Sequence, residues 1–161
     1  MTLDYDVGRL ARTRPFNLLP REAVQLIAFS CEKRRLKAGD TLFLAGETAD
    51  SAYFVHSGVI LLFTDGREPK SERRAGSGVL IGESALYVQT LRRAAARAAE
   101  EAVVIAIPRE TFRRVLAEFP AGAEKIRAEI AARTHLLVNR LEAARLKSFE
   151  APAAPRSRAA Q

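Results

Sequence analysis

Gly82, Glu83 and Arg92 are the residues whose types and spacing could bind a small ligand. A glycine after a strand lets the backbone come close to a ligand, and free amides at the start of a short helix attract an anion, most often phosphate. A carboxylate such as that of Glu83 can accept two hydroxyl hydrogen bonds from a sugar. The Arg92 guanidinium can grip a phosphate with two hydrogen bonds. Together these groups indicate a nucleotide, although a surface Glu–Arg pair beside a loop glycine remains an open alternative.

The chain that must position these residues shows two kinds of sequence pattern, one typical of strands and one typical of helices. Residues 34–107 contain seven of the nine glycines and a series of short apolar runs, which predicts a small β-barrel or jelly roll. Within one run Tyr53 and Phe54 alternate, so one of them is expected in the core. The polar stretch 64–74 is expected to be an exposed hairpin loop. The runs are residues 41–44, 52–56, 59–63, 79–81 and 103–107.

Helical periodicity flanks this region. Pro20 and Glu22 suit the first turn of a helix over residues 20–29, and Cys31 is expected to be a buried small hydrophobe. Residues 108–119 and 124–146 predict two further helices, and the second carries a narrow apolar stripe suited to packing against one partner surface. The expected organisation is an arm over 1–14, a domain over 15–147 with the roll at 34–107 and helices at 108–147, and a disordered tail over 148–161.

Composition removes several classes of protein. The 161 residues are 48% hydrophobic and 28% charged, which is typical of a globular domain. One cysteine and two histidines leave no disulfide framework and little for a metal site, so no metal is expected. We expect a cytoplasmic protein, because the sequence shows neither a membrane-spanning run nor a secretory signal. An enzyme is not expected, because there is no P-loop and no Ser/His/Asp set. The net charge of +7 leaves nucleic acid or an anionic ligand to be considered.

Two glycine-patterned blocks, residues 37–58 and 76–86, resemble the cyclic-nucleotide-binding domain family, of the catabolite activator protein and protein kinase A regulatory subunit type. The ungapped segment 97–109 fits the same family. The resemblance implies an α+β, mainly β fold, namely a β-roll (a double-stranded β-helix, jelly-roll-like). An N-terminal helical segment would precede it and a long C-terminal helix would follow it.

The resemblance also implies a ligand site in a phosphate-binding cassette, residues 82–94. Glu83 matches the acid that holds the ribose 2′-hydroxyl, and Arg92 matches the arginine that pairs with the cyclic phosphate. Further positions match the family residues whose backbone amides face ribose or phosphate, namely Gly82, Ser84 and Ala85. Val79 and Leu80 match the residues that make apolar contacts to the base.

Two residues depart from the family pattern. Leu91 stands where the family has proline, and Arg93 stands where it has Ala, Ser or Thr, a position that separates cAMP from cGMP in the family. Adjacent strand residues face opposite ways, so Arg92 and Arg93 cannot both point inward. The ungapped match selects Arg92. Arg93 and Ala94 complete the set of predicted ligand-binding residues.

Three functional hypotheses follow. The first is a stand-alone receptor that binds cAMP or cGMP, needs no other cofactor and signals by movement of its C-terminal helix to an unknown protein partner. The second is a degenerate domain of the same fold that acts in protein interaction or dimerisation without a nucleotide. The third, a DNA-binding regulator, is disfavoured because the 15 residues after Leu146 are Pro/Ala-rich and cannot form a helix-turn-helix. No specific DNA binding and no membrane association are expected.

The C-terminal helix has two candidate roles under the first hypothesis, a cap over the base and a homodimer interface. The residues near the expected lid position could equally be a solvated face. They are Arg133, His135, Leu136, Asn139 and Arg140.

Overall fold

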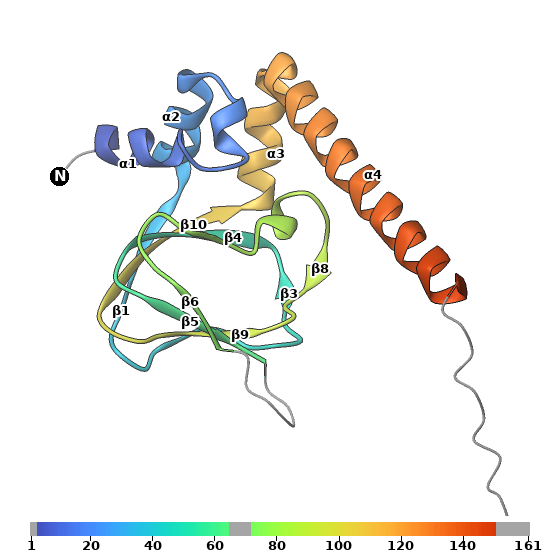
Figure 1. The fold of residues 1–161 in the computed structure, drawn as a ribbon. Coiled ribbons are helices and arrows are strands. Elements are labelled where there is room, and N and C mark those ends of the chain that lie inside the picture. The colour runs from blue at the N-terminus through green and yellow to red at the C-terminus, as the bar shows by residue number, and fades with distance from the viewer. Residues whose placement is uncertain (1–2, 65–71, 151–161) are drawn as a thin grey trace, which may run out of the picture. The chain divides into compact units, whose positions relative to one another are not determined.

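The computed structural model describes residues 3–64 and 72–150, and the chain divides into two units, residues 1–124 and 125–161. The first unit is a β-roll with short helices gathered at one end of it (Figure 1). The mainly-β class, the N-terminal helices and the long C-terminal helix predicted from the resemblance are confirmed.

Three antiparallel sheets build the roll. One has the order β1 (Glu32–Leu36), β10 (Ala102–Pro108), β4 (Ser51–Ser57), β7 (Leu80–Ile81). The second has the order β2 (Thr41–Phe43), β9 (Ala95–Ala98), β5 (Ile60–Phe63), β6 (Glu72–Ala75). The third pairs β3 (Thr48–Ala49) with β8 (Thr90–Leu91).

The helices of the first unit are tied to one another by aromatic contacts. Phe112 of α3 meets Phe16 and Tyr87 edge-on, each with ring centroids 6.0 Å apart. Both Phe16 and Phe112 are fully buried, so the N-terminal segment and α3 share one small core. The helices are α1 (Leu3–Leu10), η1 (Phe16–Leu18), α2 (Arg21–Ser30), η2 (Glu83–Leu86), α3 (Arg109–Glu118) and α4 (Pro120–Glu150).

Strand β4 is buried on both of its faces. Tyr53 lies in the cluster inside the roll, whereas the adjacent Phe54, also buried, points to the opposite face. The expectation that one of the two would be core was therefore too narrow. Small side chains fill much of the inner cluster, since five of its eleven buried members are alanines. They are Ala75, Ala96, Ala98, Ala102 and Ala106.

The structure differs from the sequence prediction in its edge strands and its ends. Residues 72–75, expected at the end of a hairpin loop, form β6, and the rest of that loop from 65 to 71 lies outside the described residues. Helix α1 occupies the expected arm. Pro120, expected as a break, is the first residue of α4, where its missing amide costs nothing. Helix α4 continues to Glu150, and the rest of the expected tail lies outside the described residues.

The second unit consists, in its described part, of α4 from Lys125 onward. Its large apolar side chains are largely exposed, and an i,i+4 ion pair of 2.9 Å joins Arg133 to Glu129. Within the described ranges, no helix is both long enough and apolar enough to cross a membrane. The exposed apolar residues are Leu136, Leu137, Val138, Leu141 and Leu146.

Gly58, in the turn between β4 and β5, tests how tightly the roll is closed. Its φ is +80°, and an added Cβ would lie 2.5 Å from the carbonyl oxygen of Glu101. We expect Gly58→Ala to lower the free energy of unfolding by about 3 kcal/mol, since strain and overlap with backbone combine. In Gly39→Ala, φ is +89° but nothing lies within 4 Å, so about 1 kcal/mol is expected. Urea unfolding measures both, and equal losses would contradict the close approach.

Candidate functional site

The predicted cassette begins where β7 ends. Gly82 has φ +73° and ψ 37°, a left-handed conformation that side chains disfavour, and it turns the chain from β7 into η2. Strand β8 follows and pairs with β3, with Thr48 opposite Leu91 and Ala49 opposite Thr90. The chain therefore returns beside η2 and brings Arg92 next to Gly82.

Arg92 is 8% exposed and its guanidinium lies against Gly82. Its Nη2 donates to the carbonyl of Ser51 at 2.6 Å, and its carbon Cζ lies 4.3 Å from the ring centre of Phe43. A Cβ at Gly82 would come within 2.5 Å of Nη1, so the glycine leaves room for the guanidinium. Burial lowers the pKa of Arg92 from its ordinary value, and Tyr53 is foremost among the groups that act in the opposite direction.

The neighbours of Arg92 face away. Arg93 is exposed, and Leu91 is 60% exposed, so the structure places the arginine of the ungapped match, and not Arg93, inside. Arg93 was also among the predicted ligand-binding residues, and its position on the outer side gives that role no support. Ala94 is half-buried.

The two residues predicted to contact the base, Leu80 and Val79, lie outside the inner cluster. Ile81 belongs to the inner cluster and pairs with Tyr53, so its neighbour Leu80 points to the opposite face of β7. The orientation of Leu80 does not support a contact inside the roll. Val79 is 43% exposed before the strand begins.

Within η2, Glu83 and the amide of Ala85 already have partners nearby. Glu83 Oε1 accepts a hydrogen bond of 2.8 Å from the hydroxyl of Tyr87. The amide of Ala85 donates to the carbonyl of Gly82 at 3.0 Å, and Ser84 is exposed. A sugar that used Glu83 would share this carboxylate with Tyr87, a residue that sequence reasoning missed.

Aromatic residues on β2 and β4 complete the surroundings of Arg92. Phe43 and Tyr53 stack with centroids 5.8 Å apart at 26°, and Arg92 lies over both rings. A cation over an aromatic face is attracted by the ring quadrupole, so the two rings partly compensate the buried charge. The burial of Tyr53 inside the roll could have been predicted from the apolar run of β4, which is typical of a strand buried on both faces.

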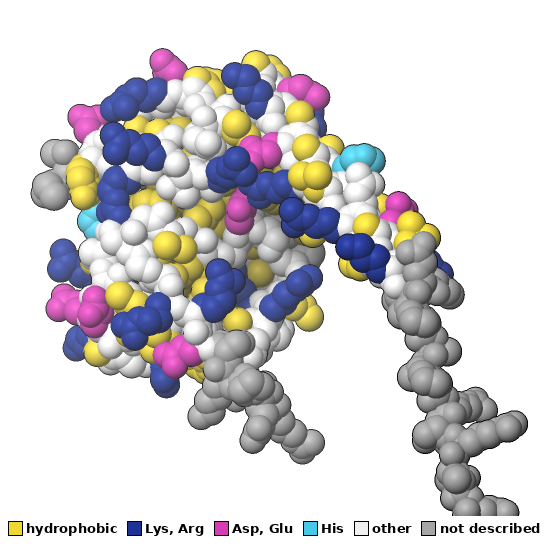
Figure 2. Space-filling model, viewed as in Figure 1, with side chains coloured by type: hydrophobic (Ala, Val, Ile, Leu, Met, Phe, Trp, Pro, Cys, Tyr) yellow, Lys and Arg dark blue, Asp and Glu magenta, His cyan; other side chains and the backbone are white. Residues whose placement is uncertain are grey.

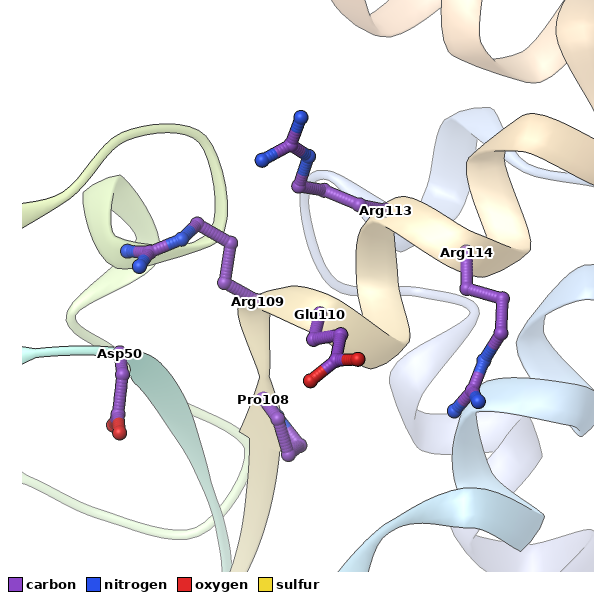
Figure 3. A pocket seen from close by; sticks show the side chains of 6 residues that line it. All are labelled: Asp50, Pro108, Arg109, Glu110, Arg113 and Arg114. Atoms are coloured by element: carbon purple, nitrogen blue, oxygen red, sulfur yellow. The ribbon is translucent and has the colours of Figure 1, made fainter.

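Arg109, the first residue of α3, ties the cassette to the rest of the domain. Its Nη1 lies 3.2 Å from the carbonyl oxygen of Ala49, 3.3 Å from that of Ala85 and 3.2 Å from that of Val88. Figure 3 shows its side chain reaching toward the cassette, while that of Arg114 points to the other side. One guanidinium thus joins α3, the end of β3 and η2, a role that sequence reasoning did not predict.

The hollow in which Arg109 lies is outside the predicted ligand site. It measures about 570 Å³. No residue predicted to bind the ligand appears in its lining, so the hollow is not the interior space that Arg92 faces. The lining residues are Asp50, Pro108, Arg109, Glu110, Arg113 and Arg114.

Basic side chains elsewhere on the first unit are scattered. On the face drawn in Figure 2, Lys and Arg side chains lie in several groups, with Asp and Glu side chains between some of them. In the described ranges, no three His, Cys, Asp or Glu side chains are grouped to hold a metal ion.

The roll, the left-handed turn at Gly82 and the buried Arg92 are the features that the resemblance predicted. The model of the cyclic nucleotide-binding domain matches residues 33–119, more than half of the chain, and the chain belongs to this family.

Relatives and solved structures agree with this assignment. The chain is 33% identical over 101 residues, 63% of its length, to a cAMP-dependent protein kinase regulatory subunit from Eremothecium gossypii, and spans 21% of that protein. It resembles a cyclic nucleotide-binding-like protein from Brucella abortus (40% identity, TM-score 0.66, covering 71% of this chain and 99% of that one). It also resembles the N-terminal domain of a transcriptional regulator from Streptomyces coelicolor (29% identity, TM-score 0.74, covering 83% and 94%).

The Arg109 tether predicts a local effect on the cassette. Arg109→Gln removes hydrogen bonds to three carbonyls, so we expect about 2 kcal/mol lower unfolding free energy and faster amide exchange at Tyr87 and Val88. Arg114→Gln, an exposed change of the same type on the same helix, should stay within about 0.5 kcal/mol. Urea unfolding and hydrogen exchange measure both, and indistinguishable variants would contradict the tether.

Proposed function

We propose that the chain is a non-enzymatic receptor domain for a cyclic nucleotide, cAMP or cGMP, working in the cytoplasm. The cyclic phosphate would pair with Arg92, the ribose 2′-hydroxyl with Glu83, and the base would lie in the apolar part of the roll. The ligand is the only small molecule required, and no metal or further cofactor takes part.

The buried charge of Arg92 carries this proposal. Within the described part of the chain, no carboxylate forms an ion pair with this guanidinium, which bonds the Ser51 carbonyl and lies over the rings of Phe43 and Tyr53. The carboxylates of Asp50 and Glu47 favour its charge, but without a direct ion pair. A buried charge with no ion-pair partner is costly, and an anion bound beside it would be stabilised strongly. A phosphodiester monoanion bound beside the guanidinium would supply that charge, and the guanidinium itself lies in the space that a side chain at Gly82 would fill.

Signalling would follow from a shift between two states of the cassette. A ligand that favours one position of η2 changes the populations only by its difference in affinity for the two states. Arg109 gives η2 a direct connection to α3, and α4 begins two residues after α3 ends. Movement of the C-terminal helix is therefore the proposed output, read by a separate protein partner.

Replacing each arginine of the Arg92–Arg93 pair tests the site. We expect Arg92→Ala to weaken binding of cAMP or cGMP by about 2–5 kcal/mol, because the phosphate loses its buried partner. Arg93→Ala should change binding by no more than about 0.5 kcal/mol, because its side chain is exposed. Isothermal titration with both nucleotides measures the effect and also determines which nucleotide is preferred.

Two outcomes would contradict the proposal. If only Arg93→Ala abolished binding, the inward register would be wrong. If the unaltered protein gave no heat with either nucleotide at high micromolar concentration, the receptor proposal would fail. The alternative, an interaction or dimerisation module of the same fold, would then be favoured. It is supported by Leu91 and Arg93, which depart from the family pattern, and by the prior engagement of Glu83 with Tyr87.

The exposed apolar side chains of α4 support a homodimer formed through this helix, since large apolar groups gain free energy when they leave water. We expect Leu141→Glu, at a side chain that is 70% exposed, to convert a dimer to a monomer. Ala143→Glu, at an exposed position two residues along and on the opposite side of the helix, adds the same single negative charge and is the control. Sedimentation velocity with and without nucleotide measures the effect, and a monomeric unaltered protein would exclude the dimer.

A further inference from the structure

The N-terminal helix α1 is joined by a side-chain clamp to the turn that precedes β7. Arg9 Nη1 donates to the carbonyl of His56 at 2.6 Å, and Arg9 Nη2 donates to the hydroxyl oxygen of Ser77. The Ser77 hydroxyl in turn donates to the same His56 carbonyl at 2.9 Å. The three groups close a ring in which every donor has an acceptor, across segments 47 and 68 residues apart in the sequence.

The same helix is also held in place by a buried carboxylate. Asp6 is 2% exposed, and its carboxylate lies 2.5 Å from Lys33 Nζ and 2.8 Å from His56 Nδ1. The guanidinium of Arg9 also lies over the rings of Tyr5 and Phe54, at 5.5 and 5.4 Å. Helix α1 is therefore fixed to the ends of β1 and β4, and Arg9 is the group that reaches beyond it to the turn.

The clamp holds a short segment at the edge of its sheet. Strand β7 has two residues, Leu80 and Ile81, which pair with Phe54 and Tyr53 of β4. The turn before it is supported by Gly78 N–H donating to Val55 O at 2.8 Å and Val55 N–H donating to Val79 O at 2.9 Å. Hydrogen bonds of this kind stabilise by only about 1 kcal/mol each. Gly82 follows β7 directly, so the position of the cassette depends on how firmly this turn is held.

We infer that Arg9 is a positioning residue for the nucleotide site: by clamping the turn at residues 76–78 to the end of β4, it fixes the short strand that leads into the cassette. This inference rests on the proposed function. Arg9 contacts none of the predicted ligand-binding residues through the hydrogen bonds that the structure gives, so it acts through Ser77 and the backbone. A turn ordered before binding lowers the conformational entropy lost on binding, which improves affinity without a new contact to the ligand.

A double-mutant cycle of Arg9→Gln and Ser77→Ala tests the clamp. In the unliganded protein, we expect each single change to speed amide exchange at Gly78 and Val79 by about tenfold, which corresponds to the loss of one to two hydrogen bonds. The double variant should be no faster than Arg9→Gln alone, because both changes break the same ring. Arg12→Gln, an exposed change just beyond α1, is the control and should leave exchange unaltered.

The second readout is the affinity for cAMP and cGMP, titrated well below the melting temperature of every variant. We expect both single variants to bind about 3- to 10-fold more weakly, again without additivity in the double variant. Ser77→Ala keeps α1 intact, so its result stands even if Arg9→Gln releases the helix. A merely stabilising role for Arg9 would lower the melting temperature but leave the dissociation constant of the folded protein unchanged.

The two readouts separate this inference from the proposed function. If the unaltered protein bound neither nucleotide, the proposed function would fail while the exchange cycle still reported on the clamp. Unchanged exchange at Gly78 and Val79 in both single variants would overturn the clamp. Faster exchange with unchanged dissociation constants would overturn the positioning role.

Discussion

A guanidinium inside a small β-roll must be compensated, and much of this structure can be understood from how Arg92 is accommodated. The Ser51 carbonyl takes one of its donors, two aromatic rings lie beneath it, and Gly82 leaves the space it occupies. Each of these contacts is with a neutral group, so the positive charge is tolerated without being cancelled. The left-handed turn at Gly82 and the pairing of β8 with β3 are the two features that bring Arg92 to this position.

The cassette around that charge is short, and neighbouring helices restrain it. Arg109 holds its backbone from α3, and Arg9 holds the turn that precedes it from α1. Both do so through backbone carbonyls or a hydroxyl, and neither uses a carboxylate in these contacts. Two helices distant in sequence thus restrain one short segment, in addition to the burial of its own Ala85 and Leu86.

The sequence predicted the central strands and the inward arginine but not the supports around them. Strands β4 and β10 have long apolar runs, whereas β1 and β6 lie at sheet edges, carry charged side chains and show no such pattern. Helix α1 is short, and its charged residues gain partners only in the folded protein. The inward placement of Arg92 came from the family resemblance. The roles of Ser51, Tyr87 and Arg109 depend on backbone carbonyls or local geometry, which residue types do not reveal.

The alanines of the inner cluster have a consequence for how this site can change over evolution. A single base change in an alanine codon can yield valine, serine, threonine or glycine, so each position such as Ala96 or Ala102 is one mutational step from two added methyl groups, an added hydroxyl or the loss of a methyl. An interior lined by large side chains has no comparable series of small steps, because its shape changes in larger increments of volume. The interior of the roll is therefore adjustable by the smallest alterations available to a gene.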